Sequence, residues 1–195
     1  MHGLINTAIE TFVTRTYGQD VWEGIVADVG LDPPEFNPLL HYEDAVTAQV
    51  LSALETRLGR PAQALLEDLG TYLISSPAIP AIRRLLRFGG ETYADFLLSM
   101  DELPDRARVT VDDLHLPDLK VDQCSETRFE LWCGPGLPGF DHVLLGVLRA
   151  MADEFGALAI LDHHEADNSD AMIAVEIVQD AFSEGRAFEL GAVPA

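Results

Sequence analysis

Apolar side chains recur at helical spacing through the first part of the chain. The first such stripe lies between Met1 and Tyr17 and consists of Leu4, Ile5, Ala8, Ile9, Phe12 and Val13. Similar stripes follow, separated by Gly18, Gly59 and the proline-rich segment 33–38. The pattern predicts six or so helices, the last of which, "ETYADFLLSMDELP", runs up to Pro104.

After Pro104 the pattern becomes typical of strands. The strand-like stretches are "VTVDDLHLPDLKVD", "TRFELWC", "ALAILDHHE" and "AMIAVEIVQ", and the amphipathic helix "GFDHVLLGVLRAMADEFG" separates the second from the third. The last two stretches form a predicted hairpin across "HHEADNSD". The predicted fold class is α+β, with an N-terminal helical subdomain packed on a small antiparallel sheet that carries one long helix. We expect one domain over residues 1–179 and a loosely ordered tail over 180–195.

Composition and charge narrow the classes of partner. The net charge of −21 repels phosphate backbones and anionic lipid, so nucleic acid and membrane surfaces are not expected partners. No apolar run approaches the roughly 20 residues that a membrane span needs, and the start of the chain lacks the features of a signal peptide. Cys124 and Cys133 are therefore expected to be free, reduced thiols in a cytoplasmic protein.

Candidate catalytic chemistry is sparse. No glycine-rich phosphate loop or nucleophile elbow is found, and nothing assembles a nucleophile, a base and an orienting group. His163 and His164 are interpreted as part of a solvated turn, because adjacent strand residues point to opposite faces and do not easily share one ion. His142, at the start of the long helix, is interpreted as a surface or capping residue. No enzymatic activity is predicted, and an enzyme that uses His142, His163 or acidic groups is the third and weakest hypothesis.

Several separate blocks of the chain resemble one family in order and spacing. "MHGLINTAIE", "YGQDVW", "LEDLGTYL", "FLLSMDELPD", "LHLPDLKV" and "GFDHVLLGVLRAMADEFG" are similar to the H-NOX family (haem nitric oxide/oxygen binding, HNOB). This family includes the sensor domain of soluble guanylate cyclase and stand-alone bacterial relatives. The resemblance covers roughly residues 1–179 and implies haem-based NO or gas sensing, with haem held between a helical subdomain and the sheet.

The two polar anchors that the family uses for haem are replaced in this sequence. The resemblance places the iron-ligating histidine at Pro104, and a proline side chain has no nitrogen lone pair to give to iron. It places the Tyr-x-Ser-x-Arg motif, which grips the haem propionates, at Cys133, Pro135 and Leu137.

The apolar residues that surround haem in the family are matched better in this sequence. Positions that line the distal pocket are matched by Ile5, Ile9, Leu73, Val143 and Val147, and positions that pack against the macrocycle are matched by Met100 and Pro117. All of these residues would also serve as core in any protein of this fold.

Two further hypotheses rest on this resemblance. The first is a sensor that still holds haem, with no axial ligand or with His115 as a substitute; its apolar distal side at Val143 would favour NO over oxygen. The second is a haem-free family member that binds another apolar ligand or serves as a protein-interaction module. In both cases we expect a signalling partner in trans, a histidine kinase or a cyclic-di-GMP enzyme by family analogy.

Overall fold

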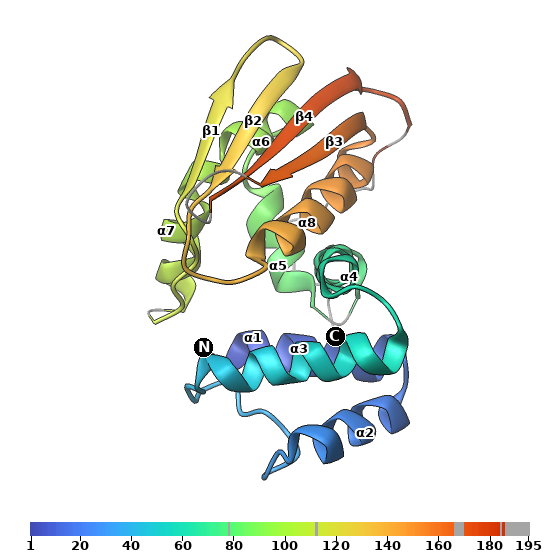
Figure 1. Cartoon of the computed structure of the whole chain (residues 1–195). Coiled ribbons are helices and arrows are strands. Elements are labelled where there is room, and N and C mark those ends of the chain that lie inside the picture. The colour runs from blue at the N-terminus through green and yellow to red at the C-terminus, as the bar shows by residue number, and fades with distance from the viewer. Residues whose placement is uncertain (78, 112, 166–169, 184, 186–195) are drawn as a thin grey trace, which may run out of the picture. The chain divides into compact units, whose positions relative to one another are not determined.

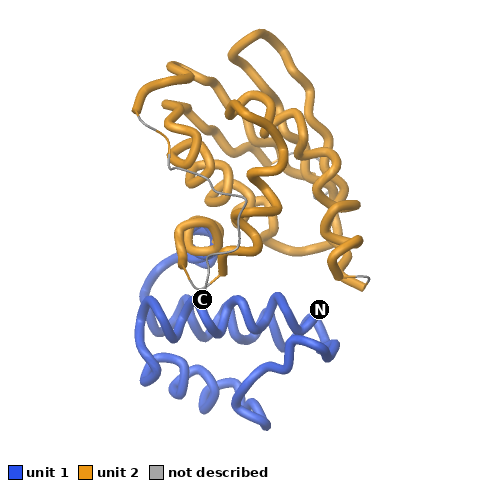
Figure 2. Tube along the Cα trace, turned by 180° about the vertical axis from the view of Figure 1, so that it is seen from behind, with its two compact units in different colours: residues 1–69 blue, residues 70–195 orange. Residues whose placement is uncertain are grey.

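The computed structural model describes residues 1–77, 79–111, 113–165, 170–183 and 185. The chain divides into two compact units, which we call unit 1 (Met1–Leu69) and unit 2 (Gly70–Ala195) (Figure 2). Each unit is described by itself, and the expectation of one domain over 1–179 stays a prediction.

Unit 1 is helical, as its apolar stripes predicted. Its helices are α1 (Gly3–Thr16), α2 (Gln19–Val29), α3 (Asp44–Leu58) and the first part of α4 (Ala62–Ser75). Gly30 and Gly59 end α2 and α3 with positive φ angles of 71° and 60°, a conformation that glycine adopts without steric cost. The core of the unit includes Trp22, which is 2% exposed and donates its indole N–H to the carbonyl oxygen of Pro34 over 3.2 Å.

The helices of unit 2 differ from the sequence prediction around Pro104. After α5 (Pro80–Arg87) and α6 (Tyr93–Leu98), the chain forms a short 3₁₀ turn, η1 (Met100–Glu102), and a further helix, α7 (Leu103–Thr110). Pro104 lies in the first turn of α7, where a missing N–H costs nothing because that turn has no intrahelical acceptor for it. The predicted helix end at Pro104 is therefore wrong, and of the strand-like stretch predicted from Val109 only the part from Leu119 onward is a strand. None of the described helices is long and apolar enough to cross a bilayer.

The sheet of unit 2 has four antiparallel strands. They are β1 (Leu119–Gln123), β2 (Arg128–Cys133), β3 (Leu158–Glu165) and β4 (Ala171–Gln179), in the spatial order β1-β2-β4-β3. The long helix α8 (Phe140–Phe155) connects β2 to β3 and packs on β3 and β4 (Figure 1). The predicted α+β class, the long helix and the antiparallel pairing of the last two strands are confirmed. Residues 166–169 of the predicted turn lie outside the described residues.

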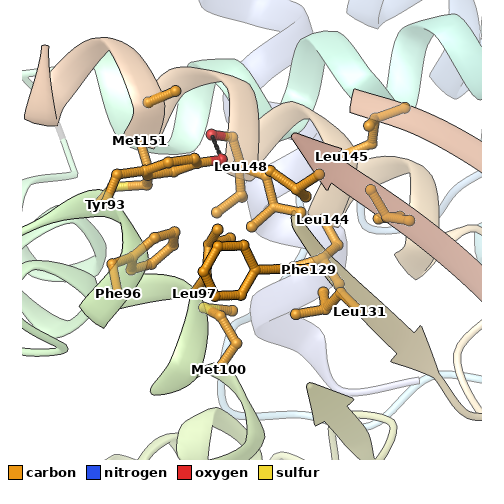
Figure 3. Packing of buried hydrophobic residues seen from close by; sticks show 14 of the residues in the cluster. Tyr93, Phe96, Leu97, Met100, Phe129, Leu131, Leu144, Leu145, Leu148 and Met151 are labelled. Carbon is orange, nitrogen blue, oxygen red and sulfur yellow. Dashed lines mark hydrogen bonds between the residues drawn. The ribbon is translucent and has the colours of Figure 1, made fainter. Parts of the chain in front are cut away.

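The core of unit 2 fills the space between α6, η1, α8 and the sheet (Figure 3). The rings of Tyr93 and Phe96 stack with centroids 5.8 Å apart, and Phe129 on β2 belongs to the same cluster and has no exposed surface. Tyr93 donates its hydroxyl hydrogen to the carbonyl oxygen of Leu148 over 3.0 Å, so its polar atom is satisfied inside the core.

The tail predicted from residue 180 onward is described only in part. The main-chain N–H groups of Phe182 and Ser183 donate to the carbonyl oxygen of Gly156, over 2.8 and 3.1 Å. These bonds fasten the start of the tail to the turn that follows α8. Residues 184 and 186–195 lie outside the described residues.

Candidate functional site

The position that the resemblance assigns to the iron ligand is a buried turn. Pro104 is buried in the first turn of α7, directly after η1. Arg106 fastens this turn by donating from Nη2 to the carbonyl oxygen of Ser99 over 2.7 Å. The position is thus well fixed in the fold, but its side chain offers iron no donor atom.

The two residues expected to pack against the macrocycle are both buried. Met100 lies in η1, has no exposed surface and belongs to the continuous core cluster of unit 2. Pro117 is buried just before β1. In this structure Met100 is a core residue, which is the role that such residues have in any protein of this fold.

His115, the candidate substitute ligand, lies on the surface. Its side chain is exposed, and its Nδ1 atom lies 2.9 Å from the carbonyl oxygen of Asp113. A ligand to a buried iron needs a ring nitrogen that points into the interior. The observed position of the ring does not provide one.

The three positions matched to the propionate-gripping motif follow one another at the end of β2. Cys133 is buried, Pro135 is exposed and Leu137 is half-buried. Only Cys133 carries a polar hydrogen, and its thiol lies 3.7 Å from the carbonyl oxygen of Gly134. These side chains therefore supply neither the charge nor the hydrogen-bond donors that hold a propionate.

Acidic groups surround this end of β2. Burial, followed by the negative charges of Asp141 and Asp170, raises the pKa of the Cys133 thiol to about 12. A hollow of about 200 Å³ lies beside it, lined by Asp118, Leu119, Lys120, Trp132, Cys133, Gly134 and Asp170. The ammonium of Lys120 already pairs with Asp122 at 2.7 Å. The local field thus opposes an added anion.

Three residues of the predicted distal shell come together in unit 2. α4 and α8 approach so closely at Gly70 that an added β-carbon would overlap the carbonyl oxygen of Val143. Leu73 follows Gly70 by three residues and so shares its face of the helix, while Val147 lies one turn beyond Val143 on α8. The face of α4 that carries Leu73 is thus turned toward the part of α8 that carries Val143 and Val147.

The other two shell residues belong to unit 1. Ile5 and Ile9 lie one turn apart on the same face of α1. Ile9 is 3% exposed and Ile5 is half-buried.

A histidine cluster that sequence reasoning missed lies where α8 begins. His163 lies on β3 with its side chain 15% exposed, and its Nε2 atom is 2.6 Å from Oδ2 of Asp141. His142 stacks on it, with ring centroids 4.5 Å apart, and is 16% exposed. The interpretations of His163 as a solvated turn residue and of His142 as a surface or capping residue are therefore wrong; Gly139 precedes α8 as its N-cap. Asp141 and His163 are 22 residues apart, so no local motif signals the cluster.

The comparisons with known proteins agree on one family. The family model described as Haem-NO-binding (HNOB) matches residues 2–160. "Soluble guanylate cyclase gcy-31" of Caenorhabditis elegans is 25% identical over 154 residues, which is 79% of this chain and 22% of that protein. "Soluble guanylate cyclase gcy-35" of the same organism is 30% identical over 104 residues, 53% of this chain and 15% of that protein. The chain thus spans about a fifth of the length of such relatives.

Solved structures support the same fold. The Fe(II) unliganded H-NOX protein from K. algicida superposes with a TM-score of 0.81 at 15% identity, over 94% of this chain and all of that chain. The I5F mutant of T. Tengcongensis H-NOX gives a TM-score of 0.75 at 19% identity, over 93% of this chain and all of that chain. The family consists of haem-based gas-sensor domains rather than catalytic domains. The chain belongs to the Haem-NO-binding family and has the H-NOX fold.

Proposed function

We propose that this chain is a sensor or signalling domain of the Haem-NO-binding family that works without a histidine-ligated haem. The observation that carries the proposal is Pro104, buried in the first turn of α7 at the position that the resemblance assigns to the iron ligand. When bound, haem would supply the iron that captures NO. The residues that would have to hold it here do not fit it.

The charge near Cys133 supports a haem-free state. Haem carries two propionates, and the family grips them with a tyrosine, a serine and an arginine. In this chain the matched segment offers no such side chain. Burial first, and then the negative charges of Asp141 and Asp170, raise the pKa of the nearby Cys133 thiol. The same charges would repel a propionate placed there.

The packing of unit 2 favours a protein-interaction module over a binder of another apolar ligand. Met100 matches a position that would face the macrocycle, yet it has no exposed surface and packs in one cluster with Leu103, Leu131 and Leu144. A side chain that is already packed among others has little apolar surface left for an added ligand to bury. We therefore propose that signalling proceeds through contact with a partner in trans in the cytoplasm, a histidine kinase or a cyclic-di-GMP enzyme by family analogy.

Restoring an imidazole at residue 104 tests the coordination argument. Purified wild-type protein, Pro104→His and the matched control Pro104→Ala are titrated with haemin, and binding is followed by the Soret absorption band. We expect Pro104→His to bind haem at least about tenfold more tightly than the other two, a gain of about 1.4 kcal/mol. Wild-type protein that binds haem as tightly as Pro104→His would contradict the proposal.

A further inference from the structure

The cluster of Asp141, His142 and His163 has the composition of a transition-metal site. Two imidazoles and one carboxylate form the ligand set that proteins use for zinc and similar divalent ions when one coordination position stays open. One potential ligand atom from each of the three residues lies within 4.8 Å of those of the other two. All three residues belong to unit 2, and they come from two elements, the start of α8 and the strand β3.

The distances within the cluster are close to those of a bound metal. The Oδ2 atom of Asp141 lies 2.6 Å from Nε2 of His163 and 3.7 Å from Nε2 of His142. Two ligand atoms that each lie about 2.0–2.1 Å from a tetrahedral ion are about 3.4 Å apart. Insertion of an ion therefore requires the first distance to open and the second to close by less than about 1 Å, which side-chain rotation can supply.

His142 gives a second, independent indication. Its Nδ1 atom is buried and has no hydrogen-bond partner among the described residues. Its Nε2 atom stands 3.7 Å from Asp141, beyond hydrogen-bond distance. Among the described residues, neither nitrogen of this imidazole has a hydrogen-bond partner in the protein, so the ring is not committed to another group of the chain.

The surroundings suit a cation. Asp141 supplies one negative charge, the protein as a whole carries a net charge of −21, and the three side chains are only 15–20% exposed. Partial burial weakens competition from water for the carboxylate but leaves a route for an ion to enter. Nitrogen ligands disfavour magnesium and calcium, which prefer oxygen.

We propose that Asp141, His142 and His163 bind a divalent transition-metal ion of the zinc type. The ion joins the first turn of α8 to β3 and leaves a fourth position for water or an external ligand. This site is independent of the haem question, because none of its residues is one that the resemblance assigns to haem.

Zinc binding to the full chain tests this proposal directly. Chelator-treated protein is titrated with Zn²⁺ by calorimetry at neutral pH. We expect one saturable site, and His142→Gln and His163→Gln each to weaken it by more than about tenfold. The matched controls are His164→Gln, which is exposed on the neighbouring position of β3, and His41→Gln, which alters the contact of the His2 and His41 rings in unit 1. Both controls should bind zinc as the wild type does.

Cobalt gives a readout that needs no variant. Co²⁺ in a tetrahedral site with nitrogen ligands shows visible d–d absorption, and we expect such bands in wild-type protein, reversed by added Zn²⁺. Circular dichroism establishes that each variant is folded. The proposal is overturned if wild-type protein shows no saturable Zn²⁺ binding, or if binding keeps its strength in the double variant His142→Gln/His163→Gln.

Discussion

Gly70 on α4 lies against the main-chain carbonyl oxygen of Val143 on α8, so closely that no β-carbon fits between them. The neighbouring atoms are backbone, which cannot turn aside as a side chain can. The contact turns the face of α4 that carries Leu73 toward the part of α8 that carries Val143 and Val147, the predicted distal shell within unit 2. The packing of these two helices therefore depends on the absence of a side chain at residue 70.

Gly70→Ala should destabilise the protein despite the better helix propensity of alanine. We expect the free energy of unfolding to fall by about 1–3 kcal/mol, because the helices must separate or shift. Urea unfolding followed by circular dichroism measures the change. Gly24→Ala on α2 is the matched control. The nearest atoms to a β-carbon there belong to the guanidinium of Arg57, which can turn aside at the loss of its contacts with Asp28 and with the carbonyl oxygen of Gly24. A Gly70→Ala variant as stable as Gly24→Ala would contradict the close packing.

Cys133 should make stability fall at alkaline pH. Its pKa in the folded protein is about 12, above the usual value of about 8.5, so the folded state keeps a proton that the unfolded chain releases. Stability is therefore fully present below about pH 8 and declines as the pH rises toward 12, by up to about 1.4 kcal/mol per pH unit.

Urea unfolding at a series of pH values, on wild type and Cys133→Ala, isolates this effect. The variant keeps every other titrating group, including the buried Tyr93, whose pKa is also raised by burial. We expect the wild type to lose about 2 kcal/mol more than the variant between pH 8 and pH 10. Parallel curves for the two proteins would show that the thiol does not retain its proton.

The ion pair between Arg83 and Glu154 should contribute to the stability of unit 2. The Nε atom of Arg83 donates to Oε2 of Glu154 over 2.6 Å, and the side chain of Glu154 is only 1% exposed. Removal of the guanidinium leaves a buried carboxylate with less compensation. We expect Arg83→Met to lower the free energy of unfolding by about 2 kcal/mol, less than for a fully buried pair because Arg83 is 29% exposed.

The matched control for this pair lies one residue further along the same helix. Arg84 is exposed, so Arg84→Met should change the free energy of unfolding by no more than about 0.5 kcal/mol. Thermal or urea unfolding compares the two variants. Equal effects would mean that the loss comes from the surface charge of α5 and not from the buried partner.

Local signals in the sequence predicted most of the fold. Gly30 and Gly59 end helices because each adopts the left-handed backbone conformation that glycine favours, so one residue type marks the end. The apolar residues of α8 recur at helical spacing along its whole length. Pro104 misled because proline either ends a helix or begins one, and the choice depends on the packing of η1 and α7. Asp141 and His163 could not be paired from sequence, because the return of the chain from α8 into β3 brings them together.

The apolar positions assigned by resemblance remain predictions as a ligand shell. Their burial in the structure fits a core as well as a pocket. The positions that the resemblance assigns to the polar haem anchors are more informative. Pro104, Pro135 and Leu137 carry no side-chain group that could ligate iron or bind a propionate.

The most direct test of the account is the absorption spectrum of wild-type protein purified from haem-supplemented cells, recorded before and after dithionite and NO. We predict no Soret band and no change with NO, because the chain lacks both the iron ligand and the propionate grip. A Soret band in proportion to protein that shifts on addition of NO would contradict the central claim, and would show that gas sensing through haem persists without the family's histidine.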